Sequence, residues 1–100
     1  METKRQAKVN RLLQRELGAI LQRNAQKFVG FGFITVTKVN VSIDLSFAKV
    51  YVSFMNHENP TELAKQLNEH VGEVKLMLGR NLKNELRKLP ELAFYYDDTL

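Results

Sequence analysis

The spacing of apolar residues changes period along this chain of 100 residues, and that change constrains the fold more than any other feature. Between residues 4 and 26, apolar residues recur three and four positions apart, as one face of a helix requires. They are Val9, Leu12, Leu13, Leu17, Ile20 and Leu21. Gly30-Phe31-Gly32 then breaks the pattern. The spacing therefore predicts a first helix over 4–26, followed by an element of a different kind.

Two β-rich segments come next, at residues 33–42 and 47–54. Alternate positions of the second segment are apolar, which is typical of a strand with one buried face. In the first segment the alternation slips near Thr37-Lys38, and a β-bulge or a strong twist there would return its valines and Ile34 to one face. The short connection from Ser42 to Ser46 contains Asp44 and predicts an antiparallel hairpin.

The second half of the chain returns to helical spacing. Asn59-Pro60-Thr61-Glu62 predicts a helix start with a capping box between Asn59 and Glu62. The apolar stripe that follows comprises Leu63, Leu67, Val71, Val74, Leu78, Leu82 and Leu86, interrupted by Gly72 and Gly79. Leu89-Pro90 should end the helices, and Leu92, Phe94 and Tyr96 alternate as a last strand. We therefore expect one α+β domain over 1–100, in the order α-β-β-α-α-β, with a three-stranded sheet packed against helices.

Composition excludes several classes of function. The chain has no cysteine, so disulfides and thiolate sites are ruled out. No apolar run has the length of a signal peptide core or a membrane span, which predicts a cytoplasmic protein without a membrane partner. No histidine has a second ligand at metal spacing, and no phosphate loop or nucleophile elbow is present. We expect no cofactor, no metal and no enzymatic activity.

Positive charge is segregated along the chain, whose formal net charge is +4. At about 100° per residue, Lys4, Lys8, Arg11 and Arg15 share one sector of the first helix. The same projection groups Arg80, Lys83 and Arg87 on the third helix. Two cationic stripes could match phosphates along an RNA backbone, with Lys38 and Lys75 as weaker candidates. Ordinary solvated helix faces are the alternative interpretation of each stripe.

Aromatic residues give a second, weaker indication of RNA binding. Phe28, Phe31, Phe33 and Tyr51 could stack on bases. Core packing, or a cover over the sheet edge, is the better explanation of each of them when it is taken singly, so none is nominated as a contact.

Several short motifs point to a known family. They are Ile34-Thr35-Val36-Thr37-Lys38-Val39, Val41-Ser42-Ile43-Asp44-Leu45, Ala48-Lys49-Val50-Tyr51-Val52-Ser53, Leu78-Gly79-Arg80, Leu86-Arg87 and Pro90-Glu91-Leu92-Ala93-Phe94-Tyr95-Tyr96-Asp97. Together with the basic amphipathic opening from Arg5 to Leu21, their order and spacing resemble bacterial ribosome-binding factor A over nearly the whole chain.

The resemblance implies a type II KH-like fold and a non-catalytic role in ribosome assembly. It implies binding to the free 30S subunit during late maturation of 16S rRNA, including processing of its 5′ end, with a part in cold adaptation. A maturation GTPase would help to release the factor, and a monomer is the simplest state. The family's Ala-x-Gly kink between the paired helices reads His70-Val71-Gly72 here.

Two other functions stay open from the sequence. One is a general KH-type module for other RNAs, which would bind short single-stranded RNA without ribosomes. The other is a protein-interaction domain that uses an exposed strand edge.

Overall fold

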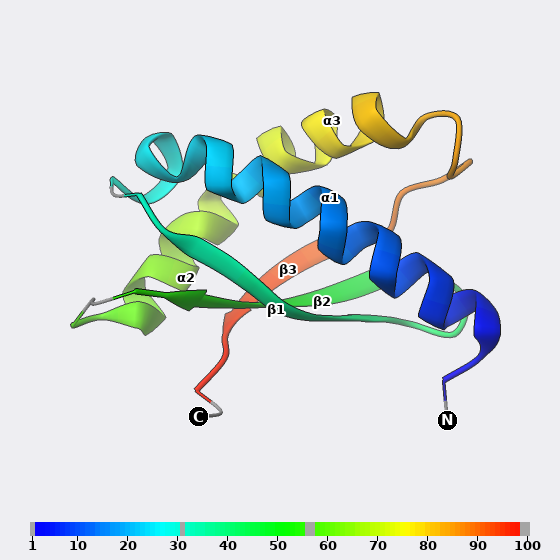
Figure 1. The fold of residues 1–100 in the computed structure, drawn as a ribbon, viewed down its shortest axis with the longest axis horizontal. Coiled ribbons are helices and arrows are strands. Elements are labelled where there is room, and N and C mark those ends of the chain that lie inside the picture. Colours follow the sequence, from blue (N-terminus) through cyan, green and yellow to red (C-terminus); the bar gives the residue numbers. More distant parts are fainter. Residues whose placement is uncertain (1, 31, 56–57, 99–100) are drawn as a thin grey trace.

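The computed structural model describes residues 2–30, 32–55 and 58–98. Its elements are α1 (Lys4–Val29), β1 (Ile34–Val41), β2 (Phe47–Phe54), α2 (Pro60–Glu69), α3 (Val71–Leu82) and β3 (Glu91–Tyr96) (Figure 1). The predicted order α-β-β-α-α-β is confirmed. Phe31, one of the aromatic residues considered above, lies outside the described residues.

The three strands form one sheet in the order β1-β2-β3. β1 pairs antiparallel with β2, as the hairpin predicted, whereas β3 pairs parallel with β2. The register shifts between Val36 and Lys38, so the predicted bulge is present. It places Ile34, Val36, Val39 and Val41 on the same buried face. A parallel partner needs a long crossover connection, and α2 and α3 supply it.

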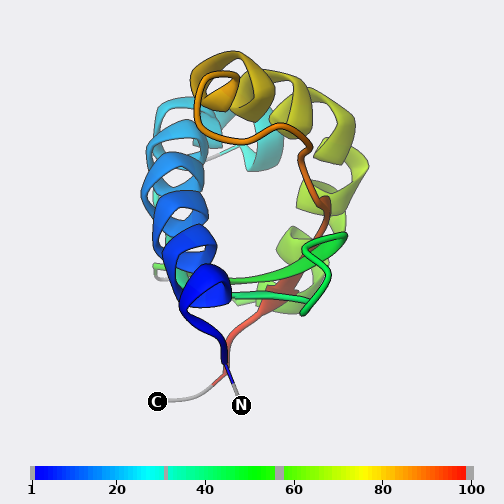
Figure 2. The ribbon, with the colours of Figure 1, turned by 90° about the vertical axis from the view of Figure 1, so that its right-hand side faces the viewer.

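Helices α1, α2 and α3 pack on one face of the sheet, and in the described part of the chain no helix covers the opposite face (Figure 2). The core lies between these layers and joins the apolar face of α1 to alternate residues of each strand. Leu13, Leu17, Val50, Val52 and Leu78 are completely buried there. Over the described ranges, no helix is both long and apolar enough to cross a membrane.

Local hydrogen bonds fix both ends of α1. The Thr3 hydroxyl accepts from the Gln6 amide, and the Gln6 side chain accepts from the Thr3 amide, which makes a reciprocal capping box. At the other end Gly30 has φ 84°, in the left-handed region that glycine adopts without strain. Helix α1 therefore extends three residues beyond the predicted end at 26.

Side-chain amides occupy both edges of the sheet. On β1, Asn10 Oδ1 accepts from the Val41 amide and Gln6 Nε2 donates to the Val41 carbonyl. On β3, Asn68 accepts from the Phe94 amide and donates to its carbonyl, at 2.8 Å in both cases. These contacts satisfy backbone groups that a further strand would otherwise pair with.

The predicted third helix is wrong at its C-terminal end. Helix α3 stops at Leu82, so Leu86 and Arg87 lie beyond it, and Lys83 is its C-cap. Leu89 explains the stop, because its Cδ1 atom lies only 3.2 Å from where a Cβ on Gly79 would be. A continuing helix would carry residue 89 about 15 Å from Gly79. The chain must turn back after Leu82 to pack Leu89 on the helix.

The predicted capping box of α2 is also wrong. Asn59 holds the N-cap position, but its side chain makes no capping hydrogen bond. Its φ and ψ of −125° and 66° differ from the extended backbone typical of a cap. Pro60 still begins the helix as predicted.

His70 separates α2 from α3 and ties their junction to the end of α1. Its ring lies 4.9 Å from the Phe28 ring, and its Nδ1 lies 3.0 Å from Glu73 Oε1. Glu73 also forms an ion pair with Lys27 at 2.7 Å. Lys27 and then His70 lower the pKa of the Glu73 carboxyl through these contacts. The junction is thus held by specific contacts of His70 with Phe28 and Glu73.

Candidate nucleic-acid interface

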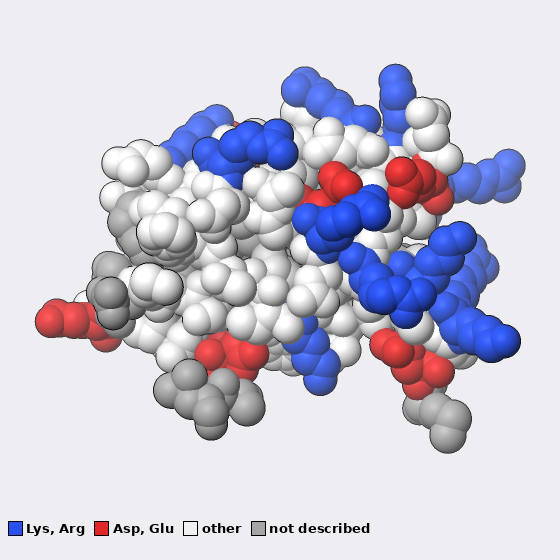
Figure 3. All heavy atoms as spheres, in the orientation of Figure 1, with Lys and Arg blue, Asp and Glu red and all other residues white. Residues whose placement is uncertain are grey.

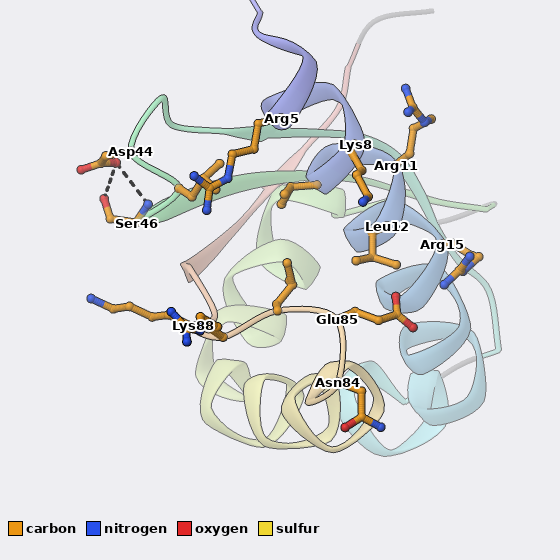
Figure 4. A pocket seen from close by; sticks show the side chains of 14 residues that line it. Arg5, Lys8, Arg11, Leu12, Arg15, Asp44, Ser46, Asn84, Glu85 and Lys88 are labelled. Carbon is orange, nitrogen blue, oxygen red and sulfur yellow. Dashed lines mark hydrogen bonds between the residues drawn. The ribbon is translucent and has the colours of Figure 1, made fainter.

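A concave, cationic surface lies where the N-terminal half of α1 faces the β1–β2 turn and the chain after α3. We call it the basic groove, and its volume is about 1020 Å³. It is lined by Arg5, Lys8, Val9, Arg11, Leu12, Arg15, Asp44, Leu45, Ser46, Asn84, Glu85, Leu86, Arg87 and Lys88 (Figure 4). Six of these residues are cationic and two are acidic.

Helix α1 positions four of the cations. Arg5, Lys8, Arg11 and Arg15 follow one another at spacings of three or four residues, so they share one side of the helix. Figure 4 shows Arg5 and Lys8 reaching toward the space opposite the helix, whereas Arg11 points outward at the rim. Burial of apolar α1 residues such as Leu13 and Leu17 fixes the rotation of the helix about its axis, and this rotation turns the side that carries the four cations toward the groove.

The other two cations come from the turn after α3. Arg87 and Lys88 belong to the segment that reverses direction so that Leu89 can pack beside Gly79. The sequence predicts that Arg87 shares a helical stripe with Arg80 and Lys83, and this grouping is wrong because α3 ends at Leu82. Arg87 lines the basic groove from the loop after α3, whereas Arg80 and Lys83 line a different hollow. In Figure 3, cationic side chains gather at the right-hand end of the molecule, over α1 and this segment.

The cations of the groove are largely free to meet a ligand. Arg15 pairs with Glu16 at 3.2 Å, and its side chain is still 66% exposed. Among the described residues, no ion pair engages Arg5, Lys8, Arg11, Arg87 or Lys88. An exposed pair such as Arg15–Glu16 is weak, so a phosphate could displace it.

Asp44 is the acidic residue in the turn at the end of the groove. The Ser46 hydroxyl, the Ser42 hydroxyl and the Ser46 amide all donate to its carboxylate. These bonds lower the pKa of Asp44 from 3.8 to about 2, with the Ser46 hydroxyl contributing most. Its charge therefore orders the turn, where Leu45 adopts a left-handed φ of 62°.

Five of the predicted contact residues lie outside the basic groove. Lys4 is exposed at the start of α1, and Lys38 lies on the uncovered face of the sheet. Lys75, Arg80 and Lys83 line a second, shallower hollow of about 540 Å³ with Gly72, Leu76, Gly79 and Leu89. Lys75 also forms an ion pair with Glu91.

Sequence reasoning missed two cations of the groove. Arg5 lies three residues before Lys8, so helical spacing could have added it to the stripe. Lys88 carries no periodic signal, because its place depends on the turn after α3. Of the aromatic residues, Phe28 belongs to the core and Phe33 is exposed.

The fold and the groove together define a KH-like α+β domain with a concave, cationic surface. A family model described as ribosome-binding factor A matches residues 5–100. The ribosome-binding factor A of Christiangramia forsetii is 41% identical over 100 residues, which cover 99% of this chain and 76% of that protein. This chain belongs to the ribosome-binding factor A family.

Solved structures agree with this assignment. The crystal structure of ribosome-binding factor A from Thermus thermophilus has a TM-score of 0.74 and 25% identity, covering 91% of this chain and 94% of that one. A homology model of the Thermus thermophilus factor was fitted into the cryo-EM map of a 30S complex. It has a TM-score of 0.69 and 26% identity, and the match covers 86% of this chain and 88% of that one. The type II KH-like fold predicted from the resemblance is confirmed.

Proposed function

We propose that this protein binds the free 30S ribosomal subunit through phosphates of 16S rRNA held in the basic groove. The observation that carries the proposal is the convergence of six cations from α1 and from residues 87–88 on one concave surface. The 30S complex described for the Thermus thermophilus relative supports the choice of partner. Family membership supports a role in late maturation of 16S rRNA, including processing of its 5′ end.

The groove acts by binding and positioning. Each Lys or Arg that neutralises a phosphate releases condensed counterions, which makes the affinity strongly dependent on salt. Phosphate contacts set the register of a protein on RNA but do not read its sequence, so RNA shape supplies the specificity. In this proposal the protein acts as a non-catalytic, cytoplasmic monomer that a maturation GTPase helps to release.

The test is co-sedimentation of the protein with isolated 30S subunits, large subunits and assembled ribosomes across a salt series. We expect selective binding to 30S subunits that weakens steeply as salt rises. The double variant Lys8→Glu/Arg11→Glu should bind more weakly, and its log–log salt slope should be smaller by roughly 2 because two phosphate contacts are lost.

Arg23→Glu/Lys65→Glu is the matched control. Both positions are exposed, make no ion pair among the described residues and lie outside the groove. The control changes net charge by the same amount, so it should bind almost as the wild type does. If both double variants lose the same affinity for 30S subunits, the groove contributes only through the net charge of the protein and is not a specific binding site. If the wild type binds 30S subunits, large subunits and assembled ribosomes equally well, the result favours a general KH-type RNA-binding module over a 30S-specific factor.

The alternative of a strand-edge partner has less support. Asn10 and Asn68 already hydrogen-bond to the edge strands at Val41 and Phe94. An incoming strand would have to displace these contacts before it could pair with the sheet.

A further inference from the structure

The sheet face that no helix covers carries a pair of aromatic rings. Tyr51 on β2 and Tyr95 on β3 are register partners, and their ring centroids are 5.8 Å apart with an interplanar angle of 35°. Tyr95 is 42% exposed and Tyr51 is partly exposed. Among the described residues, Figure 2 shows the segments before α1 and after β3 extending past this face.

Basic and polar side chains adjoin the two rings. Lys38 is the register partner of Tyr51 on β1, so the row across the sheet reads Lys38, Tyr51, Tyr95. Neighbouring strands lie about 4.8 Å apart, which places the three side chains next to one another. The adjacent row reads Asn40, Lys49, Ala93.

The charges near the rings favour an anionic ligand. Lys38 and Lys49 are exposed, and within the described part of the chain neither forms an ion pair. Glu91, at the end of β3, is paired with Lys75. The Asp97 carboxylate accepts from the Thr37 hydroxyl, which also lies 3.3 Å from the Tyr51 carbonyl oxygen, so this acid lies near the Lys38 side of the tyrosine row and away from Lys49. The positive charge beside the rings is therefore least opposed at Lys49.

We propose that this face, the tyrosine platform of Tyr51, Tyr95, Lys38 and Lys49, binds single-stranded RNA by stacking unpaired bases on the tyrosines. Exposed aromatic rings accept bases of any identity because every base has a π-face, and lysines beside them hold the backbone. The inference rests on the proposed RNA-binding function and adds a second surface, on the layer opposite the helices.

The platform differs from the basic groove in the RNA that it selects. A groove of cations with few exposed rings binds phosphates whether the bases are paired or not. The platform requires free base faces, so it should prefer oligoadenylate over oligouridylate, since purines stack more strongly, and it should reject duplex RNA.

The experiment titrates the purified protein against fluorescein-labelled oligoadenylate and follows anisotropy. The chain has three tyrosines and no tryptophan, so quenching of its intrinsic fluorescence by unlabelled RNA reports stacking on tyrosine directly. Tyr51→Ala/Tyr95→Ala should weaken binding by roughly tenfold or more. Tyr51→Phe/Tyr95→Phe keeps both rings and should bind within about twofold of the wild type, because stacking does not need the hydroxyls.

A further variant separates stacking from support of the fold. Tyr95→Leu keeps an apolar side chain on β3 but removes the ring, and its thermal unfolding checks that it is folded. Loss of oligoadenylate binding by folded Tyr95→Leu supports the platform. Unchanged oligoadenylate binding by Tyr95→Leu or by the double alanine variant overturns the platform proposal. A wild-type protein that does not bind oligoadenylate overturns it as well. In both cases a protein partner becomes the better explanation of the exposed face.

Wild-type co-sedimentation with 30S subunits is measured in parallel. If the protein binds oligoadenylate through the tyrosines but does not bind 30S subunits, the proposed function fails and the platform stands. If it binds 30S subunits but its oligoadenylate affinity is lost in Lys8→Glu/Arg11→Glu and kept in Tyr51→Ala/Tyr95→Ala, the platform fails and the basic groove stands.

Discussion

At the scale of single residues, Asn68 takes the place of a neighbouring strand. Its amide both accepts from and donates to the backbone of Phe94, with two bonds of 2.8 Å. Its Nδ2 also donates to the Ala64 carbonyl within α2, which orients the amide. One side chain thereby joins the crossover helix α2 to the edge of β3.

We expect Asn68→Ala to lower the free energy of unfolding by about 1–3 kcal/mol, because two backbone groups lose their partners. Urea unfolding followed by circular dichroism measures the change. Lys65→Ala on the exposed side of α2 is the control and should stay within roughly 0.5 kcal/mol of the wild type. An equally small effect of Asn68→Ala would mean that water replaces the amide at no cost.

Asp44 makes stability depend on pH at acid values. Its folded pKa of about 2 lies below the ordinary 3.8, so its contribution is fully present above about pH 4 and is lost as pH falls toward 2. In Asp44→Asn this part of the pH dependence should be absent. Thermal unfolding between pH 2 and about 6 tests this. A carboxyl titration of Asp44 with an unshifted midpoint would contradict the hydrogen-bonded turn.

At the scale of elements, two glycines of α1 have opposite roles. Gly18 lies inside the helix with nothing within 4 Å of an added Cβ, whereas Gly30 ends the helix at φ 84°. The first lowers helix stability without a packing reason, and the second permits the turn into β1.

Gly18→Ala should therefore stabilise the protein by about 0.5–1 kcal/mol, and Gly30→Ala should destabilise it by roughly 1 kcal/mol or more. Denaturant unfolding of the two variants measures both changes in the free energy of unfolding, which should have opposite signs. Binding of Gly18→Ala to 30S subunits should equal that of the wild type. If both substitutions stabilise the protein, the left-handed cap does not constrain this helix end.

Elements set by local periodicity were predictable from sequence, and elements set by distant contacts were not. The bulge at Thr37-Lys38 follows from the slipped alternation, and the hairpin follows from its short turn. The end of α3 depends on Leu89 packing beside Gly79, a contact that leaves no trace in the spacing of leucines. For that reason the sequence pointed to Lys8, Arg11 and Arg15 on α1 but not to Lys88, whose place depends on the turn after α3.

At the scale of the whole molecule, the domain has two exposed layers with different chemistry. The helical layer carries the basic groove, and the strand layer carries the tyrosine platform. The amides of Asn10 and Asn68 close the two edges between these layers. At Val41 and Phe94 an incoming strand would have to displace these amides before it could pair with the sheet.

We expect the wild type to remain monomeric as its concentration rises, and Asn10→Ala/Asn68→Ala to associate. The double variant exposes backbone groups at Val41 and Phe94 that can pair with another chain. Sedimentation velocity over a concentration series measures the difference. A monomeric double variant would show that the rest of each edge is protected in other ways.

The parallel pairing of β3 with β2 has a consequence for synthesis of the chain. β2 is made long before β3, and everything between them is crossover. A nascent chain that ends before residue 91 lacks Leu92 and Phe94, so its helices cannot bury their apolar faces completely. It also lacks the strand that pairs with β2 on the side away from β1. The domain therefore completes its fold only after residues 91–96 have been translated and have left the ribosome that makes them. Any function that requires the folded domain begins after that point.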